Sequence, residues 1–585
     1  MKKIFFKLFF AAAAISLFQY CANPGMPTGG PKDEAAPIVE KTSPANYSVN
    51  FEEKKISIYF DEFVVLKDMS QKFMMSPPQK KKPNIKLKGK YITIELGDSL
   101  REETTYTLDF ADAIVDNNEG NPLEGFQYAF STGEQMDTLS IRGYVQDAFN
   151  LRPVENAFVM IYDSKNDSLP LKEVPNYIAR TDSAGYFAIN NIKKTAYRII
   201  TINDNNLDYI FNSPTEPVGY LDTLFVPEAR YVETLDTLAK DSVMQRGYVL
   251  YSPADIHLML FTEEDPQQYL TKYDRPRREK FSFEFKTKRT DDLKIDLLGI
   301  EEGDDWYMVE STPNMDTLSY WITDSLIYQR DTILAELQYL KTDSLMQLVT
   351  IRDTVKLNFK SPKKAKKAKK KKKKDVKIEG PSLEMKAQIS STHDLNKEIV
   401  LDFEEPLNRF DTAMVHLFLL QDTLEIPQKF TFQKDKEHLR SYRINHKWQS
   451  ETDYKLTIDS AAFTSIYNLN NKAFERKFKT QEAEHYGRIL LTINNVKAPL
   501  IVQVLKDSEK EPIVQSKRIY TDQEVVFDYL NPETYLVKII VDENDNGKWD
   551  TGNYLKNIQP EQVHYFKNSI KIRSNWDVEE NWILQ

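Results

Sequence analysis

Cysteine is almost absent from this chain, which has a single one, Cys21, among its 585 residues. A lone cysteine excludes a disulfide framework and every metal site built from several thiolates. Glycine is also scarce, with 18 residues, and there are 27 prolines. These numbers exclude collagen-like and elastic low-complexity proteins, which need far more of both.

Motifs that carry catalysis are missing too. The chain has no nucleophile elbow, no phosphate-binding glycine loop, and no i, i+4 pair among its seven histidines. We therefore predict no catalytic residue and expect that the protein is not an enzyme. The two carboxylates of a glycosidase need no fixed spacing in sequence, so the 88 acidic residues do not decide this question.

The net charge of −10 conceals a strongly basic segment. Residues 363–374 hold ten lysines, and removing these ten charges takes the remaining chain from −10 to −20. Because phosphate binding depends on basic surface, this acidic body argues against nucleic acid as a partner. Blocks of like charge are usually solvated, which favours a spacer over a binding site for anionic lipid or polysaccharide.

The chain does have material for packed cores, since hydrophobic residues make up 41% and aromatic residues 12%. At roughly 150 residues per domain, its length predicts about four domains. Apolar and polar residues alternate, with β-branched and aromatic enrichment, in residues 55–60, 91–96, 106–110 and 454–458. Alternation is the signature of a strand, and few segments show helical periodicity, so we predict an all-β fold.

The N-terminus carries three lysines in its first seven residues, then an apolar run at residues 8–18, and Cys21 follows three residues later. This order is typical of a bacterial export signal, and the run is too short for a spanning helix, which needs about 20 apolar residues. With the cysteine in this position, residues 1–20 resemble a bacterial lipoprotein signal. The resemblance implies that Cys21 is lipidated and anchors the mature chain. An ordinary cleaved signal with an incidental cysteine is the alternative.

Residues 21–36 are rich in proline, glycine and small polar residues, which predicts a flexible tether. The sequence PTGGPKD, at residues 27–33, resembles the N-terminus of envelope lipoproteins from Bacteroidota. The resemblance implies an outer-membrane lipoprotein. It leaves open whether the chain faces the periplasm or the cell exterior.

Two segments resemble the S-layer-type bacterial Ig-like domain. In residues 37–133 the resemblance rests on four pieces: Pro-Ala-Asn at 44–46, Phe-Asp-Glu-Phe at 60–63, and residues 100–108 and 116–121. The same order recurs in residues 382–480, where the matching pieces lie at 399–406, 450–456 and 478–480. The resemblance implies a β-sandwich in each segment.

A second type of module follows each of these segments. Residues 138–228 contain the turn TDSAGYF at 181–187, in which Gly185 can adopt a positive φ and Phe187 fills the core. The turn and the strands around it resemble the carboxypeptidase-regulatory-like, or prealbumin-like, sandwich. Residues 486–585 repeat the end of this pattern. We therefore predict a string of β-sandwich modules in which an Ig-like and prealbumin-like pair is duplicated.

Residues 240–360 lie between the duplicates and are predicted to form a β-rich module of unknown type, followed by a lysine-rich linker at 361–381. Aspartate bonds its own backbone two residues on, so Asp-Thr and Asp-Ser steps predict turns that enter strands. Five such steps begin at Asp316, Asp324, Asp331, Asp343 and Asp353. If the chain is instead a carbohydrate-active or proteolytic enzyme, we expect its site in this module.

The sharpest chemical motif is DENDNGKWDTG at residues 542–552, called the Asx loop below. The ligand spacing of the first part of a calcium loop is matched by the side-chain oxygens of Asp542, Asn544, Asn546 and Asp550 and by the backbone carbonyl of Lys548. Asn553 occupies the twelfth position, where an EF-hand has glutamate. We predict a structural calcium ion here, and no other cofactor. The alternative is an Asx-rich hairpin with Trp549 packed inward.

Together these features predict a non-catalytic protein of the cell envelope. Its partners are expected to be the membrane, through a lipid on Cys21, and an envelope protein or polysaccharide. The sandwiches would act as a scaffold that binds this partner or sets a spacing, because the loops at the ends of a sandwich are exposed on a rigid frame.

Overall fold

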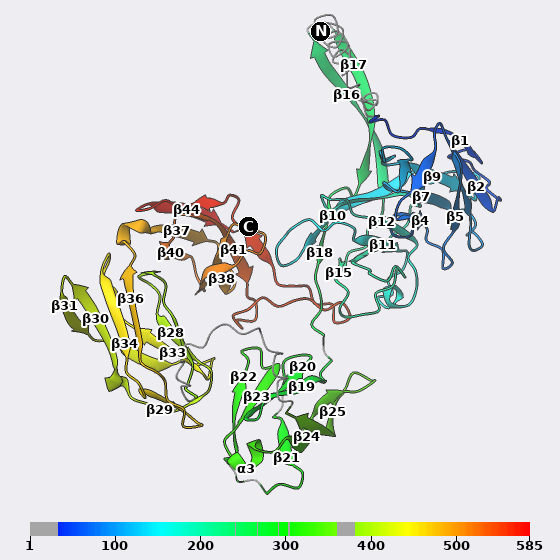
Figure 1. Ribbon diagram of the computed structural model, residues 1–585. Coiled ribbons are helices and arrows are strands. Elements are labelled where there is room, and N and C mark those ends of the chain that lie inside the picture. The colour runs from blue at the N-terminus through cyan, green and yellow to red at the C-terminus, as the bar shows by residue number, and fades with distance from the viewer. Residues whose placement is uncertain are drawn as a thin grey trace, which may run out of the picture. The chain divides into compact units, whose positions relative to one another are not determined.

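The computed structural model describes residues 33–239, 242–265, 267–289, 292–301, 303, 305–359 and 381–584. The predicted signal at 1–20, Cys21 and the lysine run at 363–374 lie outside these residues. The chain divides into two compact units: Met1–Asp147 with Arg152–Leu260, and Ala148–Leu151 with Phe261–Gln585. Both units are built from small β-sheets (Figure 1), which confirms the prediction of an all-β string of sandwiches.

The first module of unit 1 is a sandwich of two sheets, β1-β2-β6-β5 and β4-β7-β9, completed by the pair β3-β8. Alternation in the sequence places apolar side chains in its core: Ile56, Ile58 and Phe60 of β2 are at most 1% exposed. The strands are β1 (Val39–Ser43), β2 (Lys55–Phe60), β3 (Val64–Leu66), β4 (Met74–Ser76), β5 (Asn84–Lys88), β6 (Tyr91–Glu95), β7 (Thr105–Asp109), β8 (Ile114–Asp116) and β9 (Gln127–Ser131).

The second module of unit 1 also has two sheets, β13-β10-β18 and β12-β11-β14-β15. The predicted turn joins β12 to β13: Gly185 has a φ of +72° and Phe187 is 1% exposed in the core. Asp182 Oδ1 holds this turn by accepting the N–H groups of Ala184 and Tyr186. The strands are β10 (Leu139–Asp147), β11 (Phe158–Tyr162), β12 (Tyr177–Arg180), β13 (Tyr186–Ile192), β14 (Arg198–Ile202), β15 (Val218–Tyr220) and β18 (Ile256–Leu260).

Strand β18 lies within residues 240–360, which the sequence pattern predicts to form a separate module. In the structure it pairs with β10 in parallel, from Gly143 opposite Ile256 to Asp147 opposite Leu260. The chain reaches β18 through a long hairpin, β16 (Glu228–Ala239) and β17 (Ser242–Ser252). Residues 256–260 therefore complete the second module of unit 1, and the boundary of unit 1 falls at Leu260.

The central module in unit 2 again has two sheets, β19-β20-β23-β22 and β21-β24-β25. Of its predicted turn residues, Asp343 does lie at a hairpin turn, where it accepts the N–H of Leu345. Asp324 instead caps the short helix α3 (Ser325–Tyr328), and Asp353 lies inside β25. The strands are β19 (Leu270–Arg277), β20 (Lys280–Phe285), β21 (Lys294–Leu297), β22 (Tyr307–Ser311), β23 (Thr317–Ile322), β24 (Thr332–Thr342) and β25 (Leu348–Asn358).

The second Ig-like segment forms the sheets β26-β28-β33-β32 and β27-β36-β34-β30-β31, together with the pair β29-β35. Its core holds Leu401, Tyr454 and Phe463, each 0% exposed. The strands are β26 (Met385–Gln388), β27 (Thr392–His393), β28 (Ile399–Phe403), β29 (Leu407–Phe410), β30 (Val415–Gln421), β31 (Leu424–Gln428), β32 (Thr431–Lys434), β33 (Ser441–Asn445), β34 (Asp453–Ile458), β35 (Phe463–Ser465) and β36 (Phe474–Thr480).

The last module repeats the topology of the second module of unit 1. Its first sheet, β40-β37-β44, matches β13-β10-β18, and β44 pairs with β37 in parallel as β18 pairs with β10. Its second sheet runs β39-β38-β41-β42, with β43 paired to β41. The strands are β37 (Gly487–Asn494), β38 (Leu500–Lys506), β39 (Ile513–Ile519), β40 (Gln523–Leu530), β41 (Thr534–Val541), β42 (Val563–Tyr565), β43 (Ile570–Lys571) and β44 (Asp577–Ile583).

Helices are short throughout the part of the chain that the structure describes. The two α-helices, α2 (Met69–Lys72) and α3, span four residues each. None of the described helices has the length and apolar character needed to cross a membrane.

Candidate functional site: the Asx loop

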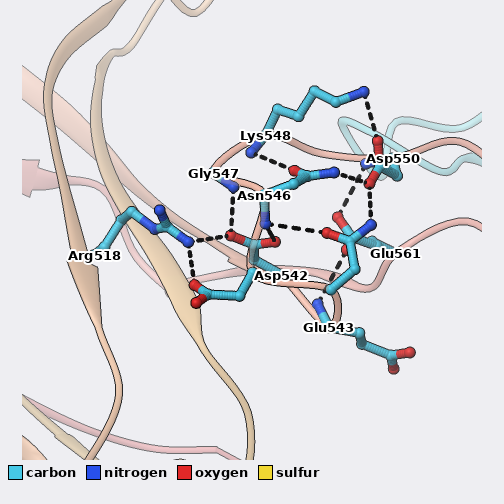
Figure 2. Close-up of polar contacts among 10 residues, drawn as sticks. Arg518, Asp542, Glu543, Asn546, Gly547, Lys548, Asp550 and Glu561 are labelled. Carbon is cyan, nitrogen blue, oxygen red and sulfur yellow. Dashed lines mark hydrogen bonds and ion pairs between the residues drawn. The ribbon is translucent and has the colours of Figure 1, made fainter.

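The Asx loop follows β41, and its first residue, Asp542, is 0% exposed. Both carboxylate oxygens of Asp542 accept hydrogen bonds. Oδ1 accepts from the N–H of Asn546 at 2.9 Å, and Oδ2 accepts from the N–H of Gly547 at 2.8 Å and from Arg518 Nη2 at 3.0 Å. Figure 2 shows the Arg518 side chain reaching toward this carboxylate. Gly547 has a φ of +82°, a conformation that glycine adopts without strain.

The side chains of Asn546 and Lys548 lie at Asp550 (Figure 2), and the side chain of Asn544 contacts it as well. Asn544 Nδ2 donates to Asp550 Oδ2 at 2.6 Å, and the side-chain amide of Asn546 donates to the same oxygen. Lys548 Nζ lies 2.8 Å from the other oxygen, Oδ1. Burial by itself raises the pKa of Asp550, but these donors outweigh it and hold the pKa below its ordinary value. The structure therefore brings Asn544, Asn546 and Asp550 together, while Asp542 forms an ion pair with Arg518.

Two residues outside the 542–552 motif, Arg518 and Glu561, bind side-chain and backbone groups of the loop. Arg518, from β39, pairs with Asp545 in addition to Asp542. Glu561 accepts the backbone N–H of Glu543 at 3.0 Å and that of Asp550 at 2.9 Å, and burial raises the pKa of Glu561 above its ordinary value. Arg518 stands 24 and 27 residues from the loop residues that it binds, and Glu561 stands 18 and 11 residues from its own, so no local pattern in the sequence predicts them.

The ligand set predicted for calcium contains only two carboxylates, Asp542 and Asp550, and draws its other oxygens from asparagine side chains and a backbone carbonyl. Over the described residues, no group of three or more His, Cys, Asp or Glu side chains is placed to hold a metal ion. Trp549 is half-buried, and its Nε1 donates to the backbone oxygen of Glu561 at 2.9 Å. The calcium site therefore stays a prediction beside the Asx-hairpin alternative.

A related loop follows β14 in unit 1. Asp204 there is 4% exposed and accepts the N–H groups of Asn206, Leu207 and Tyr209 at 2.7–3.0 Å. This loop has no glycine, and instead Leu207 and Tyr209 adopt φ values of +60° and +61°. The second module of unit 1 and the last module therefore share a buried aspartate that accepts backbone N–H groups of the loop after a core strand.

Unit 1 also contains a polar cavity that no sequence motif indicates. Its volume is about 50 Å³, and it lies where the first module of unit 1 meets the second. Its lining includes Asp109, Gln127 and Arg180. Gln127 Nε2 donates to Asp109 at 2.9 Å, whereas Arg180 Nε has no hydrogen-bond partner and burial lowers the pKa of this guanidinium. Polar cavities of this size hold ordered water.

Comparison with known proteins supports the prediction that the first module of unit 1 is Ig-like. The family model described as bacterial Ig-like domain matches residues 33–132, and no curated protein matches the chain. Solved structures that resemble it include alpha-2-macroglobulin from Escherichia coli, at 10% identity over 33% of this chain and 90% of that chain, with a TM-score of 0.15. The S-layer protein SbsC is 11% identical over 92% of this chain and 68% of that chain, with a TM-score of 0.14.

A third such structure is BcpA, the major pilin subunit of Bacillus cereus, which is 8% identical over 76% of this chain and 98% of that chain, with a TM-score of 0.12. At these TM-scores the likeness carries no argument about function. The match to the family model is specific, and it confirms the predicted Ig-like module at the start of the body. Residues 33–132 are similar to the bacterial Ig-like domain family.

Proposed function

We propose that the protein is a non-catalytic scaffold of the bacterial cell envelope, anchored in the outer membrane by a lipid on Cys21. The observation that carries this proposal is a series of β-sandwich modules, the first of them a bacterial Ig-like domain, placed after an N-terminus that resembles a Bacteroidota lipoprotein signal. Its ligand would be an envelope protein or polysaccharide held by loops at the sandwich ends.

Direct polar contacts join the modules inside each unit, as a spacing role requires. In unit 1, Ser76 Oγ of the Ig-like module accepts the N–H of Ile178 in the prealbumin-like module at 3.0 Å. In unit 2, Arg440 Nε of the second Ig-like module lies 2.9 Å from Glu310 Oε1 of the central module. Such contacts restrict the angle between neighbouring modules and favour units that hold their shape.

The competing hypothesis is a carbohydrate-active or proteolytic enzyme with its site in residues 240–360. Two of the hollows in the described residues lie outside this segment: the polar cavity of unit 1 and an open groove of about 670 Å³ along residues 51–54 and 96–102. The experiment is to incubate the purified chain with labelled envelope polysaccharide and protein. We expect retention of a ligand without turnover. Turnover that is lost when a carboxylate of β19–β25 is replaced would establish the enzyme instead.

We also propose that the Asx loop binds one calcium ion in a structural role. The support is the ligand spacing at 542–550. Asn544 and Asn546 reach Asp550 through their amide nitrogens, so binding would require these amides to turn their oxygens toward the ion. A divalent cation would relieve the repulsion among Asp542, Glu543, Asp545 and Asp550, which Arg518 and Lys548 balance in part. Its role would be to stiffen the loop between β41 and β42.

A further inference from the structure

The outer face of the sheet β1-β2-β6-β5 in unit 1 carries polar side chains in rows that cross the strands. Side chains of a strand alternate between its two faces, and Ile56, Ile58 and Ile92 occupy the core face. The residues between them therefore lie on the outer face, where strand pairing aligns them. One row is Lys41, Tyr59, Tyr91 and Lys88, and the next is Ser43, Ser57, Thr93 and Lys86.

The first row is a stack of side chains. Lys41 Nζ lies 4.7 Å from the centroid of the Tyr59 ring, and this ring stacks on that of Tyr91 with 5.0 Å between their centroids. Contacts of both kinds are attractive and hold the side chains beside one another. The two tyrosines are half-buried, whereas Lys41 and Lys88 are exposed. The row therefore places two tyrosines between two lysines on a flat surface.

This face is basic, although the body of the chain is acidic. Four lysines lie on it: Lys41, Lys55, Lys86 and Lys88. Two acidic residues accompany them, Glu40 at the bulge beside Lys41, and Glu95, whose Oε2 lies 3.4 Å from Lys86 Nζ. Four lysines less two glutamates leave a charge of +2, whereas the chain without the ten lysines of residues 363–374 carries −20.

The second Ig-like segment shows that the fold does not require this row. Its sheet β26-β28-β33-β32 has the same strand order, and Asp402 and Tyr59 each precede the phenylalanine that ends their strand. The matching row there holds Lys386, Asp402 and Ser441. Ser441 Oγ donates to Asp402 Oδ1 at 2.6 Å, so that row forms hydrogen bonds within itself. The lysines and tyrosines of the first module are therefore not needed to form the sandwich.

We propose that this outer face binds an acidic polysaccharide that lies across the four strands, an inference that rests on the proposed scaffold function and names its ligand. The lysines would form charge-assisted hydrogen bonds with carboxylates, and the serine and tyrosine hydroxyls would bond to sugar hydroxyls. Neighbouring strands lie about 4.8 Å apart, so each row repeats a polar group at about that interval, as a polymer requires. A lipid surface fits less well, because it also takes up large apolar side chains and both rows are polar.

The test is binding of the full chain carrying Cys21→Ser to immobilised polysaccharide at low salt, where exposed charges are screened least. The ten lysines of residues 363–374 are replaced by glutamine, since they would attract any polyanion. The probes are polygalacturonate, uncharged dextran, and poly-L-glutamate, which has the carboxylates without the sugar. We expect polygalacturonate to bind at least tenfold more tightly than poly-L-glutamate, and dextran not to bind. No binding to polygalacturonate, or equal binding to poly-L-glutamate, would overturn the proposal.

Charge variants locate the binding face. Lys41→Gln with Lys88→Gln removes the charges at both ends of the first row and should weaken binding to polygalacturonate at least tenfold, with the melting temperature unchanged because both side chains are exposed. The matched control is Lys386→Gln with Lys434→Gln, in the sheet of the same order in the second Ig-like segment, and it should bind as tightly as the parent chain. Equal binding by the two double variants would refute the assigned face.

Tyr59→Phe with Tyr91→Phe keeps both rings and removes the hydroxyls. This variant should narrow the preference for polygalacturonate over poly-L-glutamate, because the hydroxyls are the groups assigned to the sugar. An unchanged preference would contradict the role given to the tyrosines. Failure of this proposal differs from failure of the proposed function. A wild-type chain that fractionates with the outer membrane, while its Cys21→Ser form does not bind polygalacturonate, would keep the anchored scaffold and lose this ligand.

Discussion

Asp116, at the end of β8, shows how one buried carboxylate organises a turn. It is 3% exposed, and its oxygens accept the N–H groups of Asn118, Glu119, Gly120 and Asn121 at 2.6–3.0 Å. Burial by itself raises the pKa, but the four donors stabilise the charged form and lower the pKa of Asp116 to about 2 from its ordinary 3.8. Asp204 and Asp542 likewise accept hydrogen bonds from backbone N–H groups of their loops.

This pKa predicts a contribution to stability that depends on pH. Because the pKa of Asp116 is depressed in the folded state, its contribution is present above about pH 4 and is lost as the pH falls toward 2. Asp116→Asn should therefore lower the melting temperature of unit 1 at pH 7 and flatten its fall between pH 4 and pH 2. Calorimetry across this range checks the prediction, with the exposed Asp222→Asn as control. Parallel curves for wild type and Asp116→Asn would contradict it.

At this scale the sequence predicted part of the Asx loop and missed the rest. The spacing predicted that the oxygens of Asp542, Asn544, Asn546 and Asp550 and the carbonyl of Lys548 surround one ion, and this ligand set stays a prediction. In the structure Asn544 and Asn546 contact Asp550 through their amide nitrogens, and Asp542 pairs with Arg518. Arg518 and Glu561 could not be predicted, because strand pairing brings them to the loop from β39 and from the segment before β42.

At the scale of elements, the β12–β13 turn allows a test of why glycine is needed at position 185. Gly185 has a φ of +72°, and a Cβ there would lie 2.5 Å from the backbone oxygen of Val145. Gly125 has a φ of +69° and nothing within 4 Å of its Cβ position. Gly125→Ala should therefore cost only the backbone strain, about 1 kcal/mol. Gly185→Ala adds a clash and should cost about 2–3 kcal/mol. Denaturant unfolding measures both, and equal losses would show that the contact with Val145 is unimportant.

At the scale of elements, the Asx loop allows a test of whether calcium binds the folded chain. If calcium binds only the folded state, the chain gains about 2.7 kcal/mol at a hundredfold excess over Kd, and the melting temperature of the last module rises. Asp550→Asn should remove this gain, whereas Asp545→Asn, which changes a loop carboxylate outside the predicted ligand set, should keep it. Identical melting temperatures in millimolar calcium and in chelator would leave the Asx-hairpin alternative.

For the whole molecule, the order of modules could be predicted where each has its own local signal. The turn at 181–187 and the pieces at 60–63 and 100–108 each lie within one module, and the structure places sandwiches there. The end of the second module of unit 1 could not be predicted, because β18 pairs with β10 after the β16–β17 hairpin. Long-range parallel pairing leaves no periodic signal that marks its partner.

The anchoring of the whole molecule is the central claim, and Cys21→Ser tests it most directly. The variant removes only the sulfur that would carry the lipid, and leaves the signal at 1–20 and every module unchanged. After cell fractionation, the wild-type chain should be found with the outer membrane and Cys21→Ser in the soluble fraction outside the cytoplasm. A Cys21→Ser chain that remains in the membrane fraction to the same extent as wild type would contradict the lipid-anchored scaffold.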